Sequence, residues 1–209
     1  MQTLEQEITT LIKYNQLQLQ VNSHIKDNLN EKFLLRPYQE EALSRFIWQS
    51  KQAKRIKPTQ LLFHMATGSG KTLIMAGCIL HLYEQGYRNF IFFVNSSTII
   101  EKTKDNFLNT LSSKYLFSEN IYLKDQNIKI RSVENFQAVN SDEINILFTT
   151  IQGLHTRLNV PSENSITYED FENKDIILMS DEAHHINAET KKGKLTEKDK
   201  SDIASWENT

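Results

Sequence analysis

Short apolar runs recur along the chain and alternate with segments whose apolar residues repeat at helical spacing. Four of these runs contain no Lys, Arg, Asp or Glu: Leu61–His64, Phe90–Val94, Ile144–Phe148 and Ile176–Met179. Strands that are apolar at almost every position are typical of parallel sheets covered by helices on both faces. Strands with one exposed face instead alternate apolar and polar residues. The sequence therefore predicts an α/β fold built on a mainly parallel sheet with helices on both faces.

The segments between these runs carry the predicted helices. Helical spacing and capping residues predict helices that start at Tyr38, near Ile99 and at Ile151, and one over Leu73–Tyr83. The polar stretch Leu4–Leu29 is weakly amphipathic and predicts a peripheral N-terminal helix or hairpin. The Asn-rich segment Ser112–Asp142 is interpreted as an insertion or an edge strand.

Composition excludes several classes of protein. Of the 209 residues, 39% are hydrophobic and 24% are charged, which is typical of globular domains. The longest apolar run, Leu73–Leu80, is far shorter than the ~20 residues of a membrane helix, and Met1–Glu7 carries no secretory signal. The single cysteine, Cys78, excludes an internal disulfide and is interpreted as a buried small hydrophobe. A net charge of −2 predicts that any nucleic-acid surface is a local patch.

A glycine-rich segment, Met65–Thr72, follows the first apolar run and precedes a predicted helix. Its glycines allow the backbone to curl so that several N–H groups point at one anion, and the helix N-terminus adds its dipole. Lys71 would reach the β- and γ-phosphates of a bound ligand, and Thr72 would offer its hydroxyl to Mg²⁺. Although Met65 stands where the strict pattern has glycine, the segment predicts a phosphate-binding loop made of Thr67, Gly68, Ser69, Gly70, Lys71 and Thr72.

Two carboxylates, Asp181 and Glu182, follow the fourth apolar run almost directly. The carboxyl ends of parallel strands meet at one edge of a sheet, so these residues are predicted to lie on the same edge as the loop. Asp181 is the predicted second holder of Mg²⁺, and Glu182 is predicted to orient and deprotonate the attacking water. The sequence therefore predicts phosphoryl transfer, with Lys71 and Glu182 as catalytic residues.

Ala66–Thr72 together with Asp181–His184 resembles the motifs of the superfamily 2 helicases and translocases, whose first RecA-like domain carries both. The resemblance implies that Gln39 reads adenine and that His184 couples ATP to a second domain. It also implies that hydroxyl side chains after the second and third strands contact the DNA backbone, namely Ser96, Ser97, Thr98 and Thr150. The first three are also interpreted as a helix cap, and both roles can hold at once.

The segments Phe63–Thr72 and His184–Asn187 resemble more closely the restriction subunit of type III restriction–modification enzymes, a likeness that covers about Leu35 to the C-terminus. It implies an ATP- and Mg²⁺-dependent motor that acts on double-stranded DNA in the cytoplasm, together with a separate modification (methyltransferase) subunit. The expected divisions are an N-terminal helical extension (1–34), a first RecA-like domain (35–188) and a polar tail or truncated element (189–209). Because the family continues into a second RecA-like domain and a nuclease, the chain is expected to be an N-terminal fragment with little ATP hydrolysis of its own.

Other functions stay open at this point. The chain could belong to another superfamily 2 enzyme, such as a type I restriction motor subunit or a repair helicase. A non-catalytic nucleotide-binding remnant would keep the loop without turnover. A P-loop kinase is disfavoured, because that class needs neither Asp181–His184 at a strand end nor a Gln39 segment before the loop.

Overall fold

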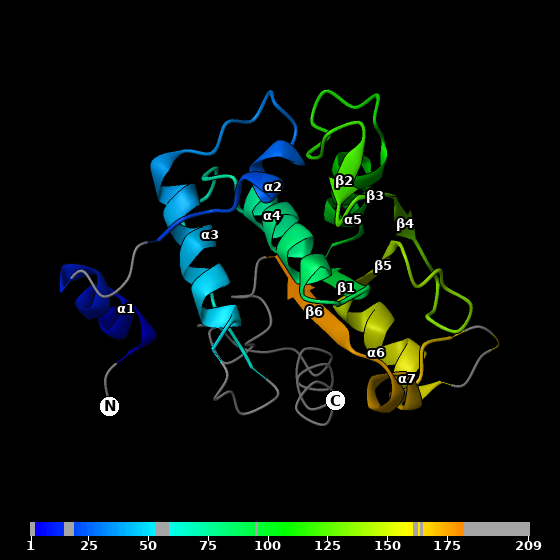
Figure 1. Ribbon diagram of the computed structural model, residues 1–209. Coiled ribbons are helices and arrows are strands. Elements are labelled where there is room, and N and C mark those ends of the chain that lie inside the picture. Colours follow the sequence, from blue (N-terminus) through cyan, green and yellow to red (C-terminus); the bar gives the residue numbers. More distant parts are fainter. Residues whose placement is uncertain are drawn as a thin grey trace. The chain divides into compact units, whose positions relative to one another are not determined.

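The computed structural model describes residues 3–14, 19–52, 59–94, 96–160, 163 and 165–181 (Figure 1). These residues form two compact units. The first unit lies within Met1–Glu84 and Leu116–Lys124, and the second within Gln85–Tyr115 and Asp125–Thr209. No helix of the described residues is both long enough and apolar enough to span a membrane.

Helices dominate the first unit, which contains α1 (Leu4–Lys13), α2 (Ser23–Asp27), α3 (Pro37–Ser50), α4 (Lys71–Glu84) and the short strand β2 (Ile121–Leu123). Helix α4 is buried along almost its whole length, as its apolar sequence predicts. It packs closely on α3, because a Cβ atom at Gly77 would lie 2.8 Å from Cδ2 of Leu43. Cys78 of α4 is buried, and burial raises the pKa of its thiol well above the ordinary value, which agrees with its interpretation as a small hydrophobe.

The prediction of a strand over Leu61–His64 is wrong. Residues 59–66 form no helix or strand, and Leu62 is 78% exposed. Exposed and half-buried residues alternate from Leu61 to Ala66, so the segment is extended but covered on one side only. Phe63, one of the half-buried residues, packs on α3 with its ring centroid 5.9 Å from that of Phe46. The apolar run therefore supplies a contact for α3 rather than a strand.

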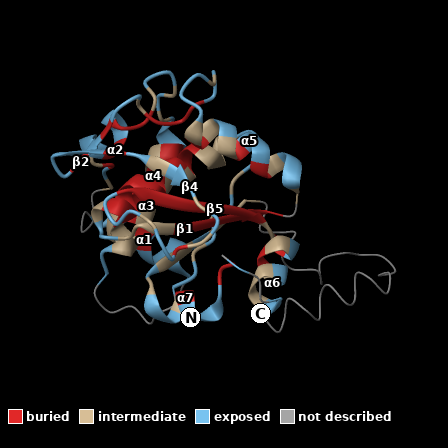
Figure 2. Cartoon of the chain, turned by 90° about the vertical axis from the view of Figure 1, so that its right-hand side faces the viewer, coloured by how far each residue is buried: buried red, intermediate tan, exposed pale blue. Residues whose placement is uncertain are grey.

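A four-stranded parallel sheet organises the second unit, in the order β4 (Ile130–Ser132), β5 (Ile144–Thr150), β1 (Asn89–Val94), β6 (Ile176–Ser180). Each of the three longer strands contains a run that the sequence analysis identified, and β4 confirms the predicted edge strand. A further short strand, β3 (Gln126–Ile128), precedes β4. Figure 2 shows β1 and β5 as buried strands between helices α5 (Ser97–Leu108) and α6 (Ile151–Asn159). The predicted mainly parallel α/β fold is confirmed.

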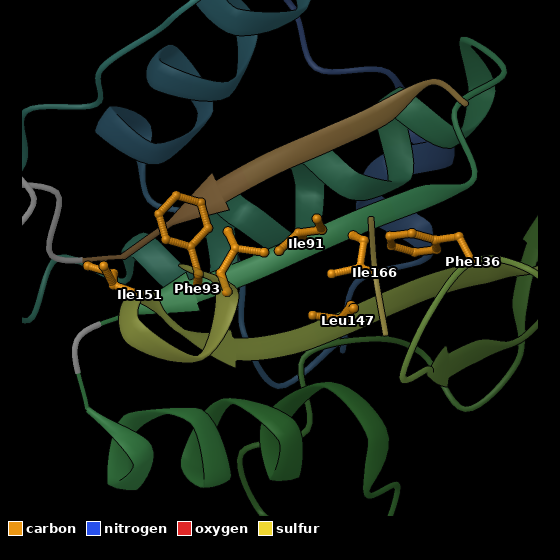
Figure 3. Packing of buried hydrophobic residues seen from close by; sticks show 7 residues of the cluster. Ile91, Phe93, Phe136, Leu147, Ile151 and Ile166 are labelled. Atoms are coloured by element: carbon orange, nitrogen blue, oxygen red, sulfur yellow. The ribbon is translucent and has the colours of Figure 1, made fainter. Parts of the chain in front are cut away.

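Successive side chains of β1 point to opposite faces of this sheet. On one face, Ile91 and Phe93 join a buried cluster with Leu147 of β5 and with Ile151 and Leu154 of α6 (Figure 3). On the other face, three aromatic rings meet, those of Phe92, Phe148 and Phe107 of α5. The β1 and β5 runs are uninterrupted because both of their faces are covered.

Helix α7 (Tyr168–Asn173) was not predicted, and β6 is less buried than its sequence suggests. The helix is held at its start by a capping box in which the Asp170 carboxylate accepts hydrogen bonds from the backbone and the hydroxyl of Thr167. In β6, Leu178 is 54% exposed. An apolar run alone therefore does not show that both faces of its strand are covered.

Candidate functional site

The glycine-rich segment forms a tight turn immediately before α4. Gly68 and Gly70 have φ angles of 77° and 81°, in the left-handed region that glycine adopts without strain. The Ser69 N–H donates to the Ala66 carbonyl at 3.2 Å, which closes the turn. The Gly70 carbonyl then accepts from the N–H groups of Leu73 and Ile74 and starts the helix. The predicted loop is thus built from the residues that the sequence analysis named.

The turn presents a concentration of positive charge. Nζ of Lys71 lies over the loop and donates to the carbonyl oxygens of Ala66 at 3.3 Å and Met65 at 3.5 Å. Among the described residues, the backbone N–H groups of Gly70, Lys71 and Thr72 have no hydrogen-bond partner. Unpaired N–H groups at the start of a helix, together with an ammonium group, are the donor set that a polyphosphate requires. The residues of this loop fit the phosphates of a nucleotide.

The start of α3 lies against this loop. Pro37 is the first residue of the helix, and Arg36 before it is extended, as the Arg-Pro pair predicts. Gln39 is only 5% exposed, and its Nε2 donates to the Ser69 carbonyl oxygen at 2.7 Å. The hydroxyl of Tyr38 donates to the same oxygen at 3.1 Å. The structure therefore brings the predicted adenine-reading residue to the phosphate loop.

The contact made by Tyr38 was missed by sequence reasoning. Its position in the first turn of the helix, next to Gln39, is the signal that could have found it. A side chain at this position shares the helix end with its neighbour and reaches the same loop. The loop is therefore contacted by two adjacent side chains rather than one.

Asp181 follows β6 in the second unit, at the carboxyl end of the parallel sheet. Its backbone carbonyl accepts a hydrogen bond from the Ser180 hydroxyl at 3.2 Å. The predicted water activator, Glu182, and the predicted coupling residue, His184, lie outside the described residues. The structure thus places one of the two predicted carboxylates at the expected end of a strand.

The hydroxyl side chains proposed to contact DNA lie at two helix N-termini of the second unit. Ser97 and Thr98 are exposed in the first turn of α5, and the Ser96 side chain makes no capping hydrogen bond to the described backbone. Thr150 is the N-cap of α6, and its Oγ1 accepts from the Gly153 N–H at 2.9 Å. Because β1 and β5 are parallel neighbours, both helix N-termini lie at the same edge of the sheet.

Comparison with known proteins assigns the chain to a family. The family model for the res subunit of type III restriction enzymes matches residues 32–207. Over 177 residues the chain is 42% identical to the probable type III restriction-modification enzyme HindVIP Res subunit of Haemophilus influenzae. That match covers 81% of this chain and 34% of the relative, so the chain spans about a third of the relative's length. No solved structure matches the chain. With its parallel sheet and a glycine-rich turn before α4, the chain is of the RecA-like α/β type and belongs to the type III restriction enzyme res subunit family.

Proposed function

We propose that this chain is the ATP-binding part of a DNA-dependent motor of the type III restriction kind. One observation carries the proposal: a single turn carries the ammonium group of Lys71 and, at the start of α4, N–H groups that have no partner among the described residues. This donor set suits a polyphosphate, and the family match supports ATP as the ligand that carries it. We propose the domain divisions 1–34, 35–188 and 189–209 on the same basis.

Each proposed site residue has a separate role. The backbone of Thr67–Gly70 and the Lys71 side chain would hold the phosphates, and Thr72 and Asp181 would hold Mg²⁺. When bound, Mg²⁺ supplies positive charge that offsets the charge developing on the phosphates. Glu182 would accept the proton of the attacking water, and His184 would couple the site to a second domain.

Gln39 can read adenine while it contacts the loop. A glutamine amide has two donor protons on Nε2 and two acceptor positions on Oε1. Nε2 uses one proton on the Ser69 carbonyl, and Oε1 accepts one hydrogen bond, from the Arg36 N–H at 2.8 Å. One donor and one acceptor are left over, which matches the donor and acceptor pair on the edge of adenine.

The role of Thr72 in holding Mg²⁺ is tested by a substitution that keeps the shape of the side chain. Thr72→Val is expected to weaken ATP binding about fivefold with Mg²⁺ present, because it removes one oxygen ligand worth about 1 kcal/mol. Without Mg²⁺ the substitution should leave the affinity for ATP unchanged. Calorimetric titrations with and without EDTA measure both values, with Thr9→Val on α1 as the control. An equal loss in both conditions would show that Thr72 acts on the fold and not on the metal.

We also propose that the α5 and α6 N-termini contact double-stranded DNA through its backbone. Ser97→Asp is a sharp test, because an acidic residue stabilises the first turn of a helix yet repels phosphate. DNA binding by the wild type should be equal for unrelated duplexes and should weaken steeply with added salt. Fluorescence anisotropy should show weaker DNA binding by Ser97→Asp than by the wild type. The control Thr9→Asp should bind DNA as tightly as the wild type. DNA binding that is sequence-selective and insensitive to salt would contradict the proposed backbone contacts.

The partners of the full-length enzyme are also part of the proposal. The matched relative is described as the Res subunit of a type III restriction-modification enzyme. We propose by this relationship that the protein works in the cytoplasm with a modification subunit that supplies target recognition.

A further inference from the structure

The Ser69 carbonyl oxygen accepts two hydrogen bonds from the first turn of α3. One comes from the Tyr38 hydroxyl at 3.1 Å and the other from Nε2 of Gln39 at 2.7 Å. A carbonyl oxygen has two acceptor positions, so both are filled from the same helix. The peptide group between Ser69 and Gly70 is therefore fixed in orientation by a pair of side chains.

Both donors are themselves held in place. Oε1 of Gln39 accepts from the Arg36 N–H at 2.8 Å, and this side chain is almost fully buried. The Tyr38 hydroxyl accepts from Nη1 of Arg36 at 3.3 Å while it donates to Ser69. The rotamers of Tyr38 and Gln39 are thus set within the first turn of α3, before any ligand is bound.

The orientation of this peptide group matters for anion binding. In a planar trans peptide the C=O and N–H bonds point in opposite directions. With the Ser69 oxygen bound to α3, the Gly70 N–H is turned away from α3, and it has no partner among the described residues. Only glycine allows this arrangement, because a Cβ atom at Gly70 would lie 2.4 Å from Nε2 of Gln39.

We propose that Tyr38 and Gln39 are positioning residues for the phosphate loop: they hold the Ser69–Gly70 peptide so that its N–H faces the polyphosphate chain. The inference rests on the proposed nucleotide-binding function and extends it. It assigns to Tyr38 a role in ligand binding and to Gln39 a second role beside adenine reading. The pair strengthens binding of the triphosphate itself, whether or not a base is attached.

A ligand without a base separates the two roles of Gln39. Mg²⁺-tripolyphosphate and Mg²⁺-ATP are titrated separately, by calorimetry or by displacement of a fluorescent nucleotide. Tyr38→Phe is expected to weaken both ligands threefold to tenfold, since it removes one donor worth about 0.5–1.5 kcal/mol. Gln39→Met should weaken tripolyphosphate to the same extent and ATP further, because it also removes the group that reads adenine. Tyr122→Phe, which removes the hydroxyl of an exposed tyrosine elsewhere in the first unit, should change neither affinity.

Unchanged tripolyphosphate affinity in both variants would overturn the proposal, and a loss confined to ATP would leave Gln39 as a base reader alone. The proposal also fails if the wild type binds ATP but not tripolyphosphate. Lys71→Ala is measured alongside. If it leaves tripolyphosphate binding unchanged, the proposed nucleotide-binding function fails, and this result is distinct from a failure of the positioning role. Tyr38→Phe keeps the ring and removes only an exposed hydroxyl, so its effect is separable from folding, and thermal melting checks this.

Discussion

Lowering the pH from about 7.5 to about 5 is expected to destabilise the protein by about 2 kcal/mol through His81 alone. This change makes unfolding about thirtyfold more favourable. His81 lies on α4, is fully buried, and contacts α3. Burial lowers the pKa of His81 from 6.5 to about 4, and the nearby positive charge of Lys51 adds to this effect.

The hydrogen bonds explain why His81 is held neutral. The Ser50 hydroxyl donates to the Ile47 carbonyl at 2.7 Å, so it can only accept from Nε2 of His81, 2.6 Å away. Nδ1 is therefore the unprotonated nitrogen, and it is buried without a partner among the described residues. A proton added to Nδ1 would place a charge in the interface between α3 and α4 with nothing to bind it.

The sign of the pH effect follows from the two pKa values. The folded pKa of about 4 lies below the unfolded value of 6.5, so His81 adds no penalty above pH 6.5. Stability is lost progressively as the pH falls from 6.5 toward 4, because the unfolded chain binds the proton more readily.

Urea unfolding at about pH 7.5 and at about pH 5 measures this loss. In a Trp206→Phe background, fluorescence reports on Trp48, which lies on α3. On acidification, the free energy of unfolding of His81→Leu should fall by about 2 kcal/mol less than that of the wild type. That of His155→Leu should fall as in the wild type, because His81 is still present. Equal pH dependence of wild type and His81→Leu would show that another group causes the loss.

The central strands and α4 could be predicted because each is a run of contiguous apolar residues, which indicates burial. Phe90–Val94 and Ile144–Phe148 have no charged side chain, and the structure covers both faces of their strands. Leu61–His64 has the same appearance but forms no strand, since Leu62 is exposed and only one side of the segment is covered. Whether an apolar run pairs as a strand depends on neighbours that are distant in sequence.

The N-terminal region shows the same dependence on distant neighbours. The polar stretch Leu4–Leu29 was predicted to be a peripheral helix or hairpin, and it contains two helices. Ile25 of the second helix is fully buried, and a Cβ atom at Gly77 would lie 3.7 Å from its Cγ2. A five-residue helix has too few turns to show an apolar period, so its burial could not be predicted from spacing.

The glycine-rich turn before α4 is local in sequence, and this is why its curl and the helix after it could be predicted. The positive φ angles of Gly68 and Gly70 and the helix that starts at Lys71 all follow from the Gly-x-Gly-Lys-Thr core. The bonds from Tyr38 and Gln39 to Ser69 join residues about thirty positions apart, and no local pattern specifies them. The sequence therefore predicts the shape of the turn better than it predicts what holds the turn in place.

Replacing Lys71 with alanine is expected to weaken Mg²⁺-ATP binding about tenfold to a hundredfold. The substitution removes a charge-assisted hydrogen bond to phosphate, worth about 1.5–3 kcal/mol. Among the described residues, the Lys71 ammonium donates to the loop carbonyls of Met65 and Ala66 at 3.3–3.5 Å, and these long hydrogen bonds let it turn to a phosphate at little cost. The fold should be retained, because the removed group is not part of a buried core.

Calorimetric titration of wild type, Lys71→Ala and the control Lys114→Ala with Mg²⁺-ATP tests the central claim most directly. Lys114 is an exposed lysine of the second unit, and its removal should leave the affinity unchanged. The account predicts saturable binding by the wild type and by Lys114→Ala, with Lys71→Ala weaker by at least about tenfold. Equal affinity of all three proteins for Mg²⁺-ATP would contradict it, because the turn before α4 would then not be the phosphate site.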